Sequence, residues 1–414
     1  MKNLQVAVEY EKGLHRLDGF IANKAEEFRN HPLNQNEEGD YKYFHSEAST
    51  HQNEYNSPPR RSLDKLCRDI LEAEEISDRI CRDLEVINIP ISETGAGESY
   101  LNPKAFNRYV GYKTIFGSEA VERLTKISGV HIHIDQYKPR LADQFNLLTA
   151  LRPTIAFTST SSINHERKNS ESCHRYKLFA DPKEGVFANI PENRDYIISE
   201  KDLKKRDKAR YQSWEKVFNA ERWRSEVPAD YNFTDFFKEF NTGYSDVRLR
   251  PDVGEGTFEL RINDSAPLDI LLGQASLVSG YINRVMRNNI PVFIAAENES
   301  YEFSKDRVIL PNKETLDNYS LLAVRYGLEN KKVQDYLSAL ENFARSGLEQ
   351  NERHYLNPLR EMTITGKNVA SQVIEYLGHK SEYNVEESTQ VNLFVHRLHQ
   401  QAVENLQQKL DYQR

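Results

Sequence analysis

One short stretch, residues 256–264, constrains the fold of this chain more than any other part of the sequence. Apolar and polar residues alternate along it, which is the period of a strand with one buried face and one polar face. The apolar residues are Phe258, Leu260 and Ile262, and the polar residues are Thr257, Glu259 and Arg261. The carboxylate of Glu259 and the guanidinium of Arg261 therefore lie two residues apart on the same face of the strand. The strand ends just before a Ser-Ala-Pro turn.

Two other stretches are built in the same way. Residues 6–11 place Glu9 and Glu11 on one strand face, and residues 129–135 place His131 and His133 on another. We expect these three strands to lie in one sheet, where their polar faces form one site.

The remaining pattern predicts an α+β fold, in which an antiparallel sheet of about six strands is interleaved with flanking helices. The expected strands are residues 4–11, 41–55 (an extended segment), 86–91, 129–135, 246–251 and 256–263. The expected helices are residues 63–84 (capped by Ser62), 103–125, 141–160 (with a break near Pro153), 200–224, 233–240 and 267–287. We expect a loop-rich segment at 161–195 and a mostly helical C-terminal third. The predicted domains are a catalytic sheet domain, 1–290, and a helical region packed on it, 291–414.

Composition excludes several classes of protein. The chain has 414 residues with 38% hydrophobic content, 22 Tyr and 19 Phe, which is typical of a globular protein. Its net charge of −8 argues against a general nucleic-acid binder. No apolar run reaches the roughly 20 residues that span a bilayer, so we expect no membrane partner and a cytoplasmic location. The cysteines lack metal-ligand spacing, so we expect Cys67, Cys81 and Cys173 to be free thiols.

The paired acids and the paired histidines each have two interpretations. Glu9 and Glu11 would repel each other on one strand face unless a cation such as Mg²⁺ lay between them, but they could also be solvated charges on an edge strand. His131 and His133 could bind a transition metal or orient a phosphate or carboxylate, but they could also be hydrogen-bonded sheet residues.

The charged residues near 256–264 also have two interpretations. Glu259 and Arg261 could form a structural ion pair, or Glu259 could hold a metal while Arg261 faces a phosphate or an oxyanion. Other arginines are candidate clamps for phosphate or carboxylate groups: Arg175, Arg248, Arg250 and Arg325. No Walker-type or Gly-x-Gly-x-x-Gly sequence occurs, so any ATP would be held by metal ions and arginines on a sheet.

In this order, the motifs resemble the carboxylate–amine ligase branch of the glutamate–cysteine ligase family, which belongs to the glutamine-synthetase-like ligases. The similar segments are Val6 to Glu11, His45-Ser46-Glu47 with Gln52-Asn53-Glu54, Gly129 to Ile134, Leu151 to Ser161, Asp246-Val247-Arg248, Gly256 to Asp264, and Arg325 to Glu329. The resemblance covers roughly residues 4–330. It implies a curved antiparallel catalytic sheet like that of glutamine synthetase and the guanidino kinases.

The resemblance also implies an activity. The enzyme would use ATP to join a small carboxylate, with glutamate expected, to an amine through an acyl phosphate, giving an amide such as a γ-glutamyl bond. Residues implied to hold Mg²⁺ or Mn²⁺ are Glu9, Glu11, Glu54, His131 and Glu259. The implied catalytic residues are Arg261, Glu259 and Glu11. Those implied to bind ATP or substrate are Arg175, Arg248, Arg250 and His133.

Two alternatives stay open at this point: a phosphotransferase of the guanidino-kinase kind, and a non-catalytic relative that binds metal or nucleotide. The amine acceptor is open, and a homo-oligomer is compatible with the sequence.

Overall fold

The computed structural model describes most of the chain. The described residues are 3–36, 38, 40–93, 96–102, 106–160, 172–180, 195–221, 231–237, 245–297, 299–378 and 384–412.

A seven-stranded antiparallel sheet organises the described part of the chain. Its order is β2-β3-β1-β5-β7-β6, and β4 also pairs with β1. The strands are β1 (Val6–Arg16), β2 (Phe44–Ser46), β3 (Gln52–Asn56), β4 (Val86–Ile89), β5 (Gly129–Asp135), β6 (Val247–Arg250) and β7 (Thr257–Asp264). The expected fold class, an antiparallel sheet with flanking helices, is confirmed.

The longest strand, β1, lies at the centre because three other strands pair with it. Its N-terminal half pairs with β5, and its C-terminal half pairs with β4 beyond the end of β5. The register between β5 and β7 shifts next to His131: two residues of β7, Arg261 and Ile262, stand opposite this one residue of β5, so β7 forms a bulge. Such bulges bend a sheet locally and increase its twist.

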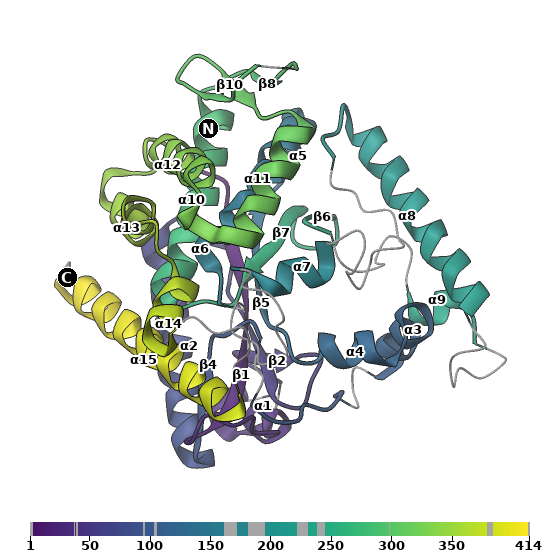
Figure 1. Ribbon diagram of the computed structural model, residues 1–414, viewed down its shortest axis with the longest axis vertical. Helices are drawn as coiled ribbons and strands as arrows, with labels where there is room; N and C mark the ends of the chain where they lie inside the picture. Colours follow the sequence, from purple (N-terminus) through teal and green to yellow (C-terminus); the bar gives the residue numbers. More distant parts are fainter. Residues whose placement is uncertain are drawn as a thin grey trace.

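Helices surround the sheet (Figure 1). They are α1 (Ala25–Asn30), α2 (Leu63–Leu84), α3 (Phe106–Phe116), α4 (Ser118–Leu124), α5 (Leu141–Thr149), α6 (Ile155–Thr158), α7 (His174–Ala180), α8 (Glu200–Glu221), α9 (Phe233–Phe236), α10 (Leu268–Arg287), α11 (Lys313–Tyr326), α12 (Lys331–Arg345), α13 (Asn357–Thr365), α14 (Val369–Leu377) and α15 (Val385–Tyr412). Short 3₁₀ segments are η1 (Pro32–Asn34), η3 (Lys138–Arg140), η4 (Arg152–Thr154), η6 (Gly327–Glu329) and η7 (Gln350–Leu356).

The apolar face of the sheet packs on a large core. The alternating residues Phe258, Leu260 and Ile262 are fully buried there, as the sequence predicted. The buried helix α10 contacts β1 and β5, and it also packs against α12, α13 and α15. The same core cluster therefore extends from the sheet to α15. The predicted division at residue 290 stays a prediction.

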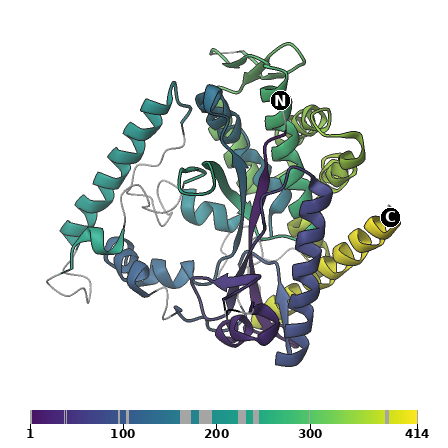
Figure 2. The ribbon, with the colours of Figure 1, turned by 180° about the vertical axis from the view of Figure 1, so that it is seen from behind.

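A second, aromatic core lies to one side. It joins α3, α4, α8 and α9, with Trp214, Phe218, Phe233 and Phe237 at its centre. Figure 1 shows α8 and α9 standing beside α3, away from the helices that cover the main sheet. Figure 2 shows the same separation from behind, with α2 running along the opposite flank.

Three local expectations are corrected. Residues 174–180 of the expected loop form α7, while residues 161–171 and 181–194 lie outside the described part. The C-terminal region contains a small sheet of order β8-β10-β9 besides its helices, formed by β8 (Val292–Ile294), β9 (Glu302–Phe303) and β10 (Val308–Leu310).

The third correction concerns the start of α2. Ser62 stands at the N-cap, but its side chain makes no cap hydrogen bond; instead, the buried Glu352 of η7 accepts from the backbone N–H of Leu63 at 2.8 Å.

Two further expectations are confirmed. The segment 141–160 is helical and is interrupted by η4 at Pro153. The three cysteines are free and buried. Within the described ranges, every helix is too short or too polar to cross a bilayer.

Candidate functional site

Strand register brings the predicted polar residues together on one face of the sheet. Glu11 of β1 lies opposite Glu54 of β3, and Glu9 of β1 lies opposite His131 of β5. Paired residues in antiparallel strands project from the same face, so the four side chains are neighbours. Across the next two strand pairs, Glu259 is opposite both His133 and Arg248.

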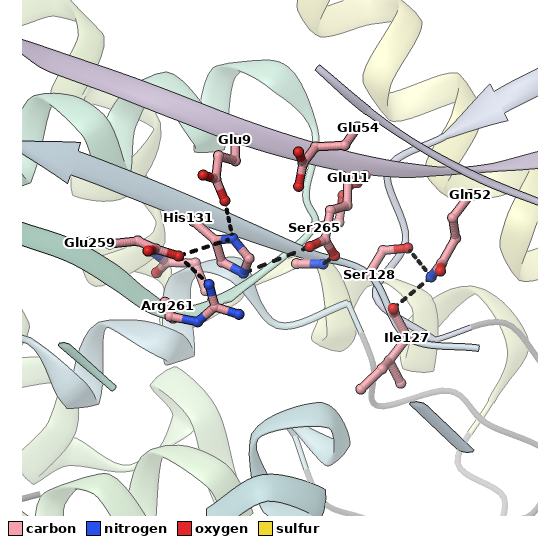
Figure 3. A network of polar contacts seen from close by, with 12 residues as sticks. Glu9, Glu11, Gln52, Glu54, Ile127, Ser128, His131, Glu259, Arg261 and Ser265 are labelled. Atoms are coloured by element: carbon pink, nitrogen blue, oxygen red, sulfur yellow. Dashed lines mark hydrogen bonds and ion pairs between the residues drawn. The ribbon is translucent and has the colours of Figure 1, made fainter. Parts of the chain in front are cut away.

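Glu9 bridges the two histidines. Its Oε2 lies 2.7 Å from Nδ1 of His131, and its Oε1 lies 2.9 Å from Nε2 of His133 (Figure 3 shows the His131 contact). Burial alone would raise the pKa of Glu9, but the hydrogen bonds and charges of the two imidazoles outweigh it and lower that pKa. Glu9 is therefore held ionised between two histidines.

Glu259 is enclosed by arginines. Arg248 contacts its Oε2 through Nε at 2.7 Å and Nη2 at 2.6 Å, and Nη1 of Arg250 lies 3.3 Å from the same oxygen. Arg261 bonds the other oxygen, Oε1. Burial would raise the pKa of this inaccessible carboxyl group, but Arg261 and Arg248 lower it well below its usual range. This end of the polar face is rich in cations.

The other end is rich in anions. Glu11, Glu47 and Glu54 present carboxylate oxygens that lie within 4.8 Å of one another. Burial, followed by the charge of Glu47, raises the pKa of Glu11 to about 7. Burial and the neighbouring carboxylates Glu47, Glu9 and Glu11 raise the pKa of Glu54 well above its usual value. Like charges held this close favour a bound cation between them.

Hydrogen bonds to both its side chain and its backbone fix Glu11 in place. Its Oε2 accepts from the backbone N–H of Gly129 at 2.6 Å, and its backbone carbonyl accepts from the hydroxyl of Ser265 at 2.5 Å. A Cβ on Gly129 would lie 2.2 Å from Nη2 of Arg175, so glycine is needed for this close approach.

Further polar contacts lie beside Glu11, at Gln52, two residues before Glu54 on β3. Figure 3 shows Gln52 donating to the carbonyl of Ile127 at 2.6 Å and to the hydroxyl of Ser128 at 2.9 Å.

The donor set fits divalent metal ions. Among the described residues, three groups each offer three ligand atoms within 4.8 Å of one another: Glu9 with His133 and Glu259; Glu9 with Glu54 and His131; and Glu11 with Glu47 and Glu54. The groups share Glu9 and Glu54, so they are adjacent. Each group has at least two carboxylates and at most one imidazole. Carboxylate oxygens are the ligands that suit Mg²⁺ or Mn²⁺.

The structure thus gathers the five predicted metal-site residues, together with Arg248, Arg250 and Arg261. Arg175 is also near: it approaches Gly129 and donates to the carbonyl of Asn263 at 3.0 Å. Arg325 lies on α11 with an exposed side chain. The roles of all these residues stay predictions.

Sequence reasoning missed two features of this cluster. Glu47 lies in the family-like segment without a predicted site role, although its nearness to Glu54 along the chain is a signal for one. The prediction that His133 binds ATP or substrate stays a prediction, but the sequence does not indicate that its ring nitrogen lies in a trio with Glu9 and Glu259.

Comparisons with known proteins find likeness in structure alone. No protein-family model and no curated protein sequence matches the chain. A glutamate–cysteine ligase from Francisella tularensis, solved in complex with AMP, superposes with a TM-score of 0.60 at 13% identity, over 100% of this chain and 93% of that one. A bifunctional glutathione synthetase from Pasteurella multocida gives a TM-score of 0.54 at 14% identity, over 97% of this chain and 53% of that one.

This chain therefore spans about half the length of the bifunctional enzyme and nearly all of the ligase. The resemblance that the motifs indicated is confirmed at the level of fold: the chain has the fold of glutamate–cysteine ligase.

Proposed function

We propose that this chain is an ATP-dependent carboxylate–amine ligase that forms an amide, with glutamate as acyl donor and a γ-glutamyl product. The observation that carries the proposal is one sheet face on which clustered acids and histidines adjoin three arginines. Phosphoryl transfer to a carboxylate needs both: cation ligands, and fixed positive charge where negative charge develops. The likeness in fold to an amide-forming ligase supports the same reading.

Each part of the face would have its own task. Glu9, Glu11, Glu54, His131 and Glu259 would hold Mg²⁺ or Mn²⁺. When bound, such ions supply charge neutralisation for phosphate and carboxylate oxygens.

The arginine end would hold the anionic reactants. Arg261 and Arg248 would stabilise the charge on the transferred phosphoryl group, and Arg250, Arg175 and His133 would orient ATP or the donor carboxylate. Arginine suits this role because its planar guanidinium group is always charged and can bind two oxygens of a phosphate or carboxylate at once.

The proposed reaction balances in two steps. The terminal phosphoryl group leaves ADP and bonds to a carboxylate oxygen of the donor. The amine nitrogen then attacks the acyl carbon, the carbon–oxygen bond to phosphate breaks, and the amine loses a proton. The products are an amide, ADP and phosphate. Use of ATP agrees with the cytoplasmic location that the sequence predicts.

The direct test is to incubate the protein with ATP, Mg²⁺, L-glutamate and a panel of amines that includes L-cysteine, and to measure ADP and amide by mass spectrometry. We expect ADP and amide in equal amounts, and only with a suitable amine. A phosphorylated product without amide would favour a phosphotransferase. No turnover and no nucleotide binding would overturn the proposal.

A matched pair of variants tests the site. Glu259→Gln keeps the shape of the side chain but removes its charge, so we expect turnover to fall by at least about 100-fold, the usual scale for loss of a positioned charge. Glu255→Gln changes an exposed residue of the preceding turn and should leave turnover unchanged. Full activity of Glu259→Gln would contradict the metal assignment.

A further inference from the structure

A cavity outside the acidic cluster is lined by charged groups of both signs, which suits it to bind a charged ligand. It has a volume of about 440 Å³ and lies between the 98–101 segment, the end of α3 and the end of α4. Its lining includes Lys113, Lys126, Glu122, Ser99 and Val121. Neither the proposed reaction nor the predicted metal site uses any of these residues.

The charged groups of this cavity do not neutralise one another. Lys113 and Lys126 are half-buried, and within the described chain neither has a carboxylate within 4.0 Å. Glu122 lines the same cavity and likewise forms no ion pair with a described residue. A second carboxylate, that of Glu98, also lines the cavity and accepts from the Tyr100 hydroxyl at 2.5 Å. The two ammonium groups and the Glu122 carboxylate therefore face one space without an ion pair among the described residues.

The cavity also has a fixed polar floor and an apolar wall. The hydroxyl of Ser99 lies 2.8 Å from Nδ1 of His51 and donates to the carbonyl of Thr125 at 3.1 Å. Leu101 supplies apolar surface, and Val121, which is 1% exposed, is packed beneath it in the aromatic core. A preformed pocket with a few convergent polar groups and an apolar wall is the usual form of a small-molecule site.

We propose that this cavity binds a free α-amino acid with an apolar side chain. Lys113 and Lys126 receive its carboxylate, Glu122 receives its ammonium group, and Leu101 contacts its side chain. A zwitterion is the ligand class because it alone satisfies both signs of unpaired charge at once. The inference does not depend on the proposed ligase activity.

The test is a lysine footprint on the full chain with L-leucine as the probe. Acetylation rates of Lys113 and Lys126 are measured by peptide mass spectrometry as L-leucine is titrated, with the exposed Lys201 of α8 as internal control. We expect saturable protection of both cavity lysines, reaching about tenfold at ten times the dissociation constant, because only the free cavity reacts. Lys201 should react at a constant rate.

Two analogues, each lacking one charge, test the zwitterion assignment. 4-Methylpentanoate lacks the amine of leucine, and 3-methylbutylamine lacks the carboxylate; both should protect at least about tenfold more weakly, because a charged partner in the site is left unpaired. Equal protection by 4-methylpentanoate would overturn the zwitterion, and no protection by L-leucine would overturn the site.

Variants separate binding from folding. In Lys113→Met, L-leucine should no longer protect Lys126, whereas Lys201→Met should leave that protection intact. Unchanged thermal unfolding of Lys113→Met shows that the loss is local. Protection that persists in this variant would contradict the assignment. Failure of the ligase assay would not affect these readings, since the footprint reports on the cavity alone.

Discussion

At the scale of single residues, the candidate site has two ends of opposite character. Arg248, Arg250 and Arg261 surround Glu259, so the β6–β7 end has positive charge to spare for a phosphate or carboxylate. Glu11, Glu47 and Glu54 crowd together at the β1–β3 end, where a cation would relieve their repulsion. Glu9 and the two histidines lie between them. One face can therefore hold cation and anion side by side.

Arg261 should be the most sensitive of the three arginines, because it bonds Glu259 and its charge also acts on Glu9 and Glu11. For Arg261→Gln we expect amide-forming turnover to fall by about 100-fold or more, the usual scale for loss of a fixed charge at a developing anion. Arg307→Gln removes an exposed arginine paired with Glu302 and serves as control. Equal turnover of both variants in the coupled ADP assay would contradict the role given to Arg261.

The sequence predicted which faces carry the chemistry, but not every member of the site. Alternation in 6–11, 129–135 and 257–263 is enough to place Glu9, Glu11, His131, His133, Glu259 and Arg261, because side chains of a strand alternate between faces. Glu47 follows the three-residue strand β2, too short to show a period, and its place depends on the pairing of β2 with β3. Arg175 enters from α7 through a contact with Gly129 that no local pattern encodes.

At the scale of elements, the start of α2 shows how a distant residue can replace a local cap. A serine before a helix normally accepts a hydrogen bond from the first turn. Here Glu352 takes that position by accepting from Leu63, and its carboxylate also bonds the Ser62 side chain. The N-cap of α11 follows the local rule, since the side chain of Asn312 accepts from the backbone N–H of Thr315 at 2.9 Å.

This difference gives a prediction for stability. Glu352→Ala should lower the free energy of unfolding by about 1–3 kcal/mol, because the buried N–H of Leu63 loses its acceptor. Ser62→Ala should cost less than about 0.5 kcal/mol, while Asn312→Ala should cost about 1 kcal/mol, the typical loss for a working cap. Urea denaturation followed by circular dichroism measures all three. A Ser62→Ala loss as large as that of Glu352→Ala would show that the serine caps the helix after all.

Element types were easier to predict than their pairing. The helix α2 buries one face, and α10 is buried on nearly all sides. In such long helices, the spacing of apolar residues along the sequence is enough to identify the helix. The register of the sheet depends on long-range packing, and the bulge in β7 has no sequence signal of its own. The small β8–β10 sheet was missed because its strands have only two or three residues.

At the scale of the whole molecule, the reverse side of β1 is tied to both flanking helices. Lys12, 1% exposed, bonds both carboxylate oxygens of Glu74 on α2 at 2.8 and 2.6 Å. His399 of α15 lies 3.2 Å from the same carboxylate. Since Lys12 follows Glu11 directly, the strand that carries the acids on one face is anchored by buried charge on the other. A buried pair of this kind is costly to break because one charge would be left alone.

A second buried pair should make the stability of the whole molecule depend on pH. His15 of β1 and His51 are 0% and 1% exposed, with ring centroids 6.3 Å apart. Burial lowers the pKa of His15 from 6.5 to about 4, and burial with the charges of His15 and Lys126 lowers the pKa of His51 to about 3. The folded protein therefore keeps both imidazoles neutral under conditions in which the unfolded chain protonates them.

The sign of the effect follows from proton uptake. Above pH 6.5 neither state binds these protons, and the contribution to stability is fully present. Between pH 6.5 and about 4 the unfolded state binds protons that the native state does not, so stability falls as the pH falls. Each histidine should contribute a loss approaching about 1.4 kcal/mol per pH unit. Denaturant titrations across this range should show less pH dependence for the double variant His15→Gln, His51→Gln than for His354→Gln. An identical pH dependence in both would mean that the buried pair is not the cause.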